Sequence, residues 1–348
     1  MLSRGIDGVR VPGRPKFFFG RRAELSKLVD MALDPTGGNA RIIIKGPPGI
    51  GKTTLATAIL TDHHVKSAFG PSRFFIRCSE LKGEDRSVDG LLRNLALKLR
   101  LPADGDVYDK VESKLGEFQR SIVVLDGLEA IWNSENSSAE IETERLLDLL
   151  SDIDEVVLIA TVRGKAVPQN IPWTNRLDDP LTPLSPTDAR TTFLARTDCK
   201  RAHDAAEKIS LEALVNEVDH HPQAVVLLAR LGDPPSKLLR EWKAYDKRRT
   251  EMIEADDHDG TEPELSMCVS IMLSIQLLER NIWRPLDLLR TCQESQDGLT
   301  EEHQEELRSI IPRFDRQRRL LERPGLVQAD DTGKLTVLSP IRYYHPPQ

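Results

Sequence analysis

The sequence has 348 residues, of which 39% are hydrophobic and 30% charged, and its formal net charge at pH 7 is −7. This length suits two or three domains, and this composition is typical of a soluble globular protein. The negative charge gives no overall electrostatic case for nucleic-acid binding, and no apolar run approaches the roughly 18 residues of a membrane span.

The first half alternates short β-branched runs with helical patterns. The predicted strands are Arg41–Lys45, Arg73–Cys78, Ser121–Leu125 and Val156–Thr161, and the helical patterns are Thr53–His64, Val88–Arg100, Val107–Arg120 and Glu140–Ile153. Continuous apolar strands that alternate with helices predict the α/β class, with a parallel sheet covered on both faces. A fifth strand is expected near Leu177–Leu184, although Pro180 and Pro183 argue against it.

The second half carries mainly helical patterns. From Ser185 to Ala255, Ser185 and Thr187 are candidate N-caps, Pro186 suits a first helical turn, and a later helix is expected to start at Pro222. The acidic stretch Glu254–Glu264 is predicted to be an exposed linker. Beyond it the predicted elements are helices at Leu265–Leu278, Glu301–Ile311 and Arg313–Glu322, followed by a hairpin with its turn at Asp331–Gly333. Helices followed by a hairpin indicate a winged helix.

One motif carries most of the chemical information. Residues Gly46-Pro47-Pro48-Gly49-Ile50-Gly51-Lys52-Thr53, with Thr54 after them, fit the phosphate-binding pattern G-x-x-x-x-G-K-[ST] between a predicted strand and a helix. Glycines let backbone N–H groups wrap a phosphate chain, and the helix adds its positive dipole end. Lys52 is expected to meet the β- and γ-phosphates and Thr53 to offer a hydroxyl to Mg²⁺. The motif predicts ATP or ADP binding.

Two later strand ends supply further candidates. Asp126 ends the run SIVVLD, at the sheet edge where the phosphate loop lies, and is expected to help hold Mg²⁺. Glu129 either orients an attacking water or is a plain charge at a helix start. Arg163 follows the next strand and is expected to reach the terminal phosphate. Lys52, Asp126, Glu129 and Arg163 are therefore the predicted catalytic residues.

Cysteines and histidines give no sign of a structural metal. The four cysteines (Cys78, Cys199, Cys268 and Cys292) form no CxxC pair, which indicates neither a zinc site nor a disulfide framework and fits a reducing, cytoplasmic location. His63–His64 and His220–His221 are adjacent pairs, a poor geometry for one metal ion.

Taken together, the motifs resemble those of NB-ARC-type members of the STAND class of signalling ATPases, particularly fungal ones. The matching segments are FFFGRRAEL, the phosphate loop, VVLDGLE, ATVRG, LTPLSPTDARTTFL, HHPQAVVLLARL and LTVLSPIRYY, in that order. The resemblance implies that Gly20 and Arg21 lie near the adenine and that Pro222 packs against the nucleotide. Where the family often has a second acid this chain has Gly127, and where many members have an ADP-contacting histidine it has Leu338.

We therefore expect a linker at 1–16, a P-loop domain with a five-stranded sheet at 17–184, a small helical subdomain at 185–255 and a winged-helix subdomain at 256–348. The predicted function is an ATP/ADP-binding switch with slow hydrolysis, closed with ADP and oligomerising with ATP. Family members usually add effector and sensor domains, so this chain is expected to be a fragment or a minimal core.

Two alternatives stay open. The first is an active AAA-like remodeller, for which Glu129 would be the catalytic acid and a partner would supply an arginine. The second is a winged-helix regulator that binds nucleic acid through the basic segment PRFDRQRRLLER. Against the second, the same segment fits an amphipathic helix whose buried side is Ile310, Phe314, Leu320 and Leu321.

Overall fold

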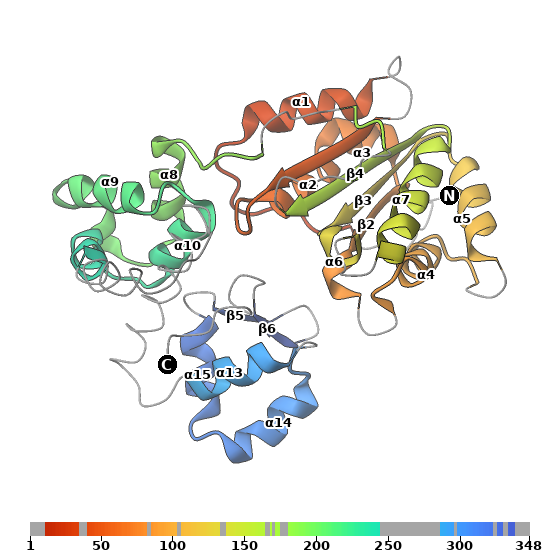
Figure 1. The fold of residues 1–348 in the computed structure, drawn as a ribbon. Helices are drawn as coiled ribbons and strands as arrows, with labels where there is room; N and C mark the ends of the chain where they lie inside the picture. Colours follow the sequence, from red (N-terminus) through yellow and green to blue (C-terminus); the bar gives the residue numbers. More distant parts are fainter. Residues whose placement is uncertain are drawn as a thin grey trace, which may run out of the picture. The chain divides into compact units, whose positions relative to one another are not determined.

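The structure is a computed structural model. It describes residues 11–34, 40–81, 85–102, 106–132, 137–163, 168, 171–174, 180–243, 286–295, 298–322, 326–329 and 333–337 (Figure 1). The chain divides into two compact units. One unit comprises Met1–Pro47 and Gly51–Thr182, and the other comprises Pro48–Ile50 and Pro183–Gln348.

A parallel sheet forms the centre of the first unit, as the alternating pattern predicts. Its strands are β1 (Arg41–Gly46), β2 (Arg73–Arg77), β3 (Ser121–Asp126) and β4 (Val156–Arg163), in the order β1-β4-β3-β2. All six residues of β3 and the first seven of β4 are buried. Strands covered on both faces need apolar side chains in both directions, which explains the continuous Val, Ile and Leu runs.

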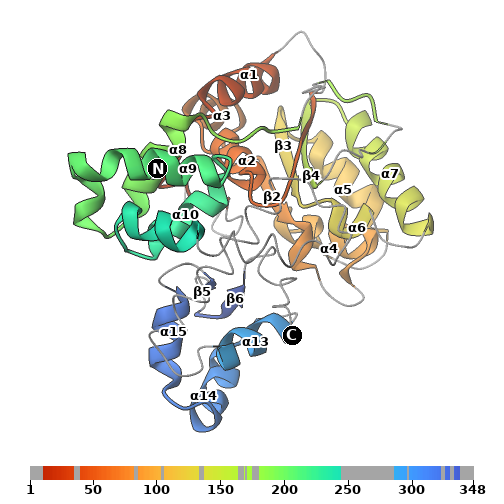
Figure 2. The same cartoon turned by 60° about the vertical axis from the view of Figure 1, so that its left-hand side comes forward.

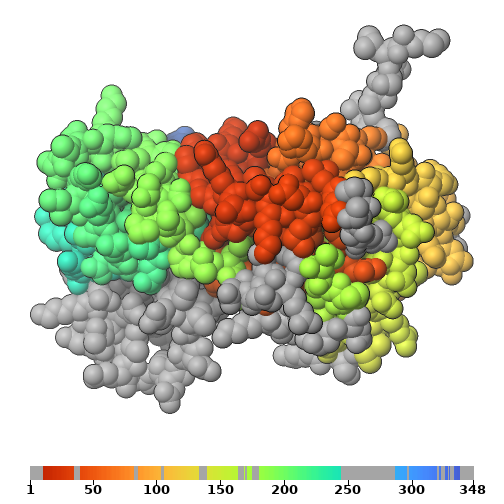
Figure 3. All heavy atoms as spheres, turned by 90° about the horizontal axis from the view of Figure 1, so that it is seen from above, coloured from red at the N-terminus to blue at the C-terminus, as the bar shows by residue number. Residues whose placement is uncertain are grey.

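Helices cover the two faces of this sheet in separate groups. One group is α1 (Arg22–Leu33), α2 (Lys52–Leu60) and α3 (His63–Phe69); the other is α4 (Val88–Lys98), α5 (Val107–Gly116), α6 (Glu129–Trp132) and α7 (Ser137–Asp152). Figure 2 shows the strands between the two groups, and the outer surface of the first group is red to orange in Figure 3. Alternate strand residues such as Ile76, Val123, Leu125 and Val162 pack in one core with α4, α5 and α7.

The predicted fifth strand is not confirmed. Residues 177–179 lie outside the described part of the chain, and 180–184 have no strand assignment. This segment still runs beside β1, because the Leu181 N–H donates to the Lys45 carbonyl over 2.8 Å. Proline has no N–H, so Pro180 and Pro183 leave this stretch with too few donors to extend a ladder.

The second unit begins with a helical group. It consists of α8 (Pro186–Arg196), the short 3₁₀ turns Lys200–His203 and Ala205–Glu207, α9 (Lys208–Glu217), α10 (Pro222–Arg230) and the helical residues 235–243. Ser185 caps α8 by accepting from the Asp188 N–H, and Pro186 is its first residue, as expected. These helices enclose a core that contains Phe193, Leu214 and Trp242.

The last elements form a second core within this unit, and Leu227 of α10 belongs to it. They are α13 (Leu286–Glu294), α14 (Glu301–Ile310), α15 (Phe314–Glu322), β5 (Val327–Ala329) and β6 (Leu335–Val337). β5 and β6 pair antiparallel, and Leu299 pairs with Leu335. The expected helix Leu265–Leu278, the linker Glu254–Glu264 and the turn residues Asp331 and Thr332 lie outside the described residues.

One core prediction in this region is wrong. Ile310 is 71% exposed, and its neighbour Ile311 is buried with Phe314 and Leu321. α14 ends at Ile310, so the chain turns there and the next residue, rather than the last helical one, points into the core.

Candidate functional site

The loop between β1 and α2 has the backbone geometry of a phosphate cradle. Gly46, Gly49 and Gly51 have φ angles of 153°, 76° and 104°. These conformations are strained for a residue with a Cβ, which explains the three glycines of the motif. The N-terminus of α2, the positive end of the helix dipole, opens onto this loop. The predicted phosphate-binding residues Gly46 to Thr54 thus lie on one continuous strand-loop-helix segment.

The ammonium group of Lys52 lies inside the loop. It is 2.7 Å from the Gly46 carbonyl oxygen and 2.9 Å from the Pro47 carbonyl oxygen, and the residue is only 8% exposed. A buried ammonium needs such acceptors because water no longer solvates it. Its hydrogen bonds hold the positive charge at the concave side of the backbone, where a phosphate chain would lie.

Asp126 and Thr53 meet at the carboxyl edge of the sheet, as the sequence predicts. The Thr53 hydroxyl lies 2.8 Å from Asp126 Oδ1 and 3.0 Å from Oδ2. A third group, which the motif analysis did not assign to the site, is Thr161. Its hydroxyl donates to Asp126 Oδ1 over 2.8 Å and accepts from the Gly127 N–H over 2.8 Å. Its position on β4, two residues before Arg163, was the sequence clue.

Burial sets the electrostatics of Asp126. The residue is 6% exposed, and burial raises the pKa of its carboxyl group above the ordinary value because the charged form is desolvated. The hydrogen bonds from the two threonine hydroxyls oppose that rise. A carboxylate and a hydroxyl are hard oxygen donors of the kind that Mg²⁺ prefers, so the residues present fit this ion.

Glu129 is engaged by Arg163. The Glu129 Oε1 atom is 3.0 Å from Arg163 Nε, and the Arg163 backbone N–H donates to Oε2 over 3.2 Å. Glu129 is also the first residue of α6, which fits its interpretation as a charge at a helix start, and its role in orienting an attacking water stays a prediction. The two candidate catalytic residues therefore hold each other in place.

The glycine-arginine turn before α1 has an unusual backbone. Gly20 and Arg21 have φ angles of 66° and 60°. The Arg21 guanidinium pairs with Glu24 over 3.1 Å and donates to the carbonyl oxygen of Thr182. This turn is therefore tied to Thr182, the last residue of the first unit.

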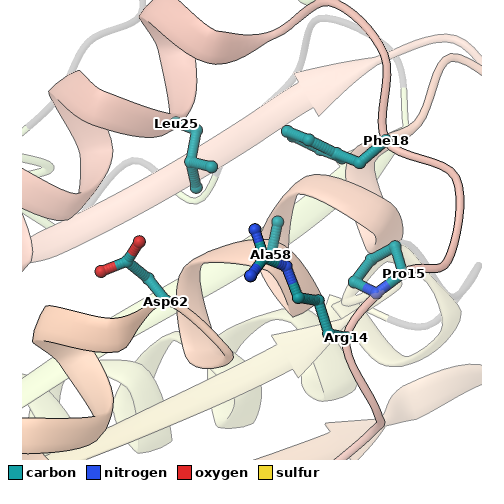
Figure 4. Close-up of a pocket in the computed structure, with 6 residues that line it drawn as sticks. All are labelled: Arg14, Pro15, Phe18, Leu25, Ala58 and Asp62. Carbon is teal, nitrogen blue, oxygen red and sulfur yellow. The ribbon is translucent and has the colours of Figure 1, made fainter.

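A small pocket lies beside that turn but away from the phosphate loop. Its lining comes from the segment before α1, from α1 itself, from the far end of α2 and from the residue that caps α3: Arg14, Pro15, Phe18, Leu25, Ala58 and Asp62 (Figure 4). None of these residues is a predicted site residue. The pocket is therefore not evidence for the phosphate site.

Within the second unit, a histidine contacts the tip of the phosphate loop. His221 is fully buried, and its Nδ1 atom accepts from the Ala224 N–H over 3.3 Å, which caps α10. A neutral ring that accepts at Nδ1 carries its proton on Nε2. Nε2 lies 3.0 Å from the Pro48 carbonyl oxygen and so donates to it. Pro48 to Ile50 belong to this same unit.

Sequence reasoning did not assign His221 to the site, and it predicted a nucleotide contact at the next residue. Pro222, the predicted nucleotide contact, is the first residue of α10. Asp219 and His220 before it have φ angles of 48° and 54°, a strained pair that no sequence pattern indicated. Among the described residues, no group of three or more His, Cys, Asp or Glu side chains could hold a metal ion. Leu338 lies outside the described residues.

Comparison with known proteins supports the class of the site. Residues 40–197 match the family model described as NACHT domain. The match supports a P-loop NTPase domain in this segment. The match covers just under half of the chain, and it supports the predicted STAND class without singling out the fungal NB-ARC type.

Two curated proteins have sequences similar to this chain. The disease resistance protein RGA5 of rice is 30% identical over 142 residues, which are 38% of this chain and 12% of that protein. An AAA ATPase forming ring-shaped complexes, from Micrococcus luteus, is 26% identical over 231 residues, which are 65% of this chain and 37% of that protein. The chain thus spans a minor part of each relative. These matches support a nucleotide-binding ATPase.

Solved structures give more distant likenesses. The Walker-type ATPase PABY2304 of Pyrococcus abyssi aligns over 96% of this chain and 97% of its own, with 14% identity and a TM-score of 0.40. The Orc1 protein of Aeropyrum pernix, in complex with DNA, aligns over 93% of this chain and 90% of its own, with 15% identity and a TM-score of 0.44.

Helices that could span a membrane are absent from the part of the chain that the structure describes, because none there is both long and apolar enough.

Proposed function

We propose that this chain is the nucleotide-operated core of a STAND-class switch that binds ATP or ADP and hydrolyses ATP slowly. The observation that carries the proposal is the ion pair between Glu129 and Arg163. A carboxylate that activates water must present a lone pair to that water. Here each carboxylate oxygen already accepts one hydrogen bond from Arg163, so a water would have to share the carboxylate with these donors, which favours a resting state with little hydrolysis.

The phosphate chemistry follows from the cradle. The loop glycines and Lys52 would bind the phosphate chain, with Pro47, Ile50 and Thr54 beside it. Thr53 and Asp126 would hold Mg²⁺, which neutralises phosphate charge when it is bound. Gly20 and Arg21 would lie near the base.

Contacts around the loop tip support a switch rather than a simple binding domain. His221 and Pro222 lie at the start of one helix, and His221 donates to the Pro48 carbonyl of the loop. A nucleotide that changes the loop would therefore act on this helix. It can shift a conformational equilibrium only through different affinities for the two states, which ADP and ATP would supply.

The remaining parts of the proposal concern architecture and setting. The order α13, Leu299 bridge, α14, α15 and hairpin β5–β6 supports a winged-helix subdomain within 256–348. The P-loop domain at 17–184, the helical subdomain at 185–255 and the linker at 1–16 complete the division. By analogy with the ring-forming relative and the resistance protein, the ATP form would be a homo-oligomer in a cytoplasmic signalling pathway of the innate-immunity type.

Turnover measurements test this proposal. The purified chain with Mg²⁺ and ATP is expected to turn over well below the ordinary enzyme range of about 1 to 10³ s⁻¹. Glu129→Gln is expected to lower the residual rate by about 100-fold, because it removes the candidate base but keeps the shape. Rapid steady-state turnover of the purified chain, with a second copy of it supplying the arginine, would instead support the second candidate, an AAA-like remodeller, which the Micrococcus relative favours.

A further inference from the structure

A second arginine stands at the same sheet edge as Asp126. Arg77 is the last residue of β2, and it is the register partner of Asp126, the last residue of β3. Because parallel strands run in step, paired residues lie at the same height along the sheet. Arg77 is therefore one strand away from the candidate magnesium ligand, at the edge where the phosphate loop lies.

Side-chain alternation directs Arg77 to the phosphate face. Ile76 packs in the core beneath α4, α5 and α7, together with Leu125 of β3. Successive residues of a strand point to opposite faces, so Arg77 and Asp126 both point to the face covered by α2. That is the helix whose N-terminus forms the phosphate cradle.

The present partners of Arg77 leave it able to move. Its guanidinium pairs with Glu80 over 2.8 Å, three residues along the chain, and lies 5.8 Å from the centre of the Phe75 ring. The side chains of Arg77 and Glu80 are 45% and 65% exposed. An exposed pair of this kind is weak, so a phosphate can displace the carboxylate. The positive charge of Arg77 already lowers the pKa of Asp126, against the effect of burial.

We propose that Arg77 binds the terminal phosphate of a nucleoside triphosphate and that Glu80 competes with that phosphate for the guanidinium. This inference rests on the proposed function and deepens it, since it assigns to Arg77 the discrimination between ATP and ADP. Arg163 approaches from β4 and Arg77 from β2, so the terminal phosphate would meet cations from strands on both sides of β3. Motif matching gave no hint of this role.

Binding measurements with four variants test the assignment. Affinities for fluorescent ADP and for a non-hydrolysable ATP analogue, both with Mg²⁺, are measured on the whole chain. Arg77→Ala is expected to lower the affinity for the analogue by about tenfold, the value of one charge-assisted hydrogen bond. It is expected to change the affinity for ADP by less than about twofold. Glu80→Ala is expected to raise the affinity for the analogue and to leave the affinity for ADP unchanged. The double variant is expected to behave like Arg77→Ala.

Arg93→Ala is the matched control, because Arg93 makes an exposed ion pair with Asp85 in the same unit at the same 2.8 Å distance. It is expected to change neither affinity. The assignment would be overturned if Arg77→Ala changed both affinities equally or changed neither. It would also be overturned if Glu80→Ala bound the analogue more weakly than wild type. Wild type that binds neither nucleotide would overturn the proposed function as well. If wild type binds ADP and Arg77→Ala binds the analogue with wild-type affinity, only the role of Arg77 would be overturned.

Discussion

The hydroxyl of Thr53 lies 2.8 Å from Asp126 Oδ1, although 73 residues separate them in the chain. Thr53 is the second residue of α2, and Asp126 is the last of β3. The sheet order puts β4 between β1 and β3, so a helix that starts after β1 reaches across β4 to the end of β3. This relationship joins the phosphate loop to its acidic partner, and Thr161 on β4 completes it.

Lys52→Ala is expected to weaken ADP binding by about 100-fold, because it removes two charge-assisted hydrogen bonds to phosphate oxygens. Titration with fluorescent ADP measures the change. Lys66→Ala, at an exposed position on α3, is the control and is expected to bind ADP normally. Unchanged affinity in Lys52→Ala would place the nucleotide elsewhere.

Asp126→Asn is expected to change how stability depends on pH. The pKa of Asp126 is raised in the folded chain, so the folded state favours the protonated carboxyl, and that preference is lost as the pH rises through the folded pKa. The asparagine variant cannot ionise. Its melting temperature relative to wild type should therefore rise as the pH increases from about 4, the ordinary carboxyl value, without nucleotide or Mg²⁺. A difference that stays constant or falls over this range contradicts the pKa direction.

The ion pair of Glu129 and Arg163 is expected to be energetically coupled. Its side chains are 19% and 35% exposed, and Glu129 accepts from both the side chain and the backbone of Arg163. A double-mutant cycle with alanine at both positions should give about 1 kcal/mol by denaturant unfolding. The same cycle on the exposed pair Arg93–Asp85 should give less, and equal values would remove the argument that Glu129 is held.

His221 has two functions that substitution can separate. His221→Ala is expected to destabilise the chain by about 1 kcal/mol through loss of the α10 cap. His221→Asn restores a capping side chain but is too short to keep the hydrogen bond to the Pro48 carbonyl. The asparagine variant should therefore melt near wild type while its ADP affinity falls. Wild-type affinity in both variants would show that the loop contact has no bearing on nucleotide binding.

Features that depend on local backbone conformation could be predicted from the sequence. The glycines of the loop, the strand end at Asp126 and the cap at Ser185 each follow from local conformational preference, and they could be predicted. The pairing of Glu129 with Arg163 depends on where α6 starts after a turn at Gly127, which has a φ angle of 72°. No pattern in a single sequence encodes that distance.

Other features depend on tertiary packing in the same way. The contact of His221 with the loop depends on two consecutive residues with positive φ. The proximity of Arg77 to Asp126 follows only from the register of β2 against β3. The unconfirmed fifth strand is the opposite case, because it was predicted at a place where two prolines limit the ladder. Ile310 was misplaced because its helix ends one residue earlier than the pattern suggested.

The central claim is that ATP and ADP stabilise different states of this chain. Light scattering of the purified chain tests it directly, with Mg²⁺ and either ADP or a non-hydrolysable ATP analogue, and with Lys52→Ala as the control that cannot respond. The account predicts the mass of one chain with ADP and a multiple of that mass with the analogue. The same mass with both nucleotides, while both bind, would contradict it.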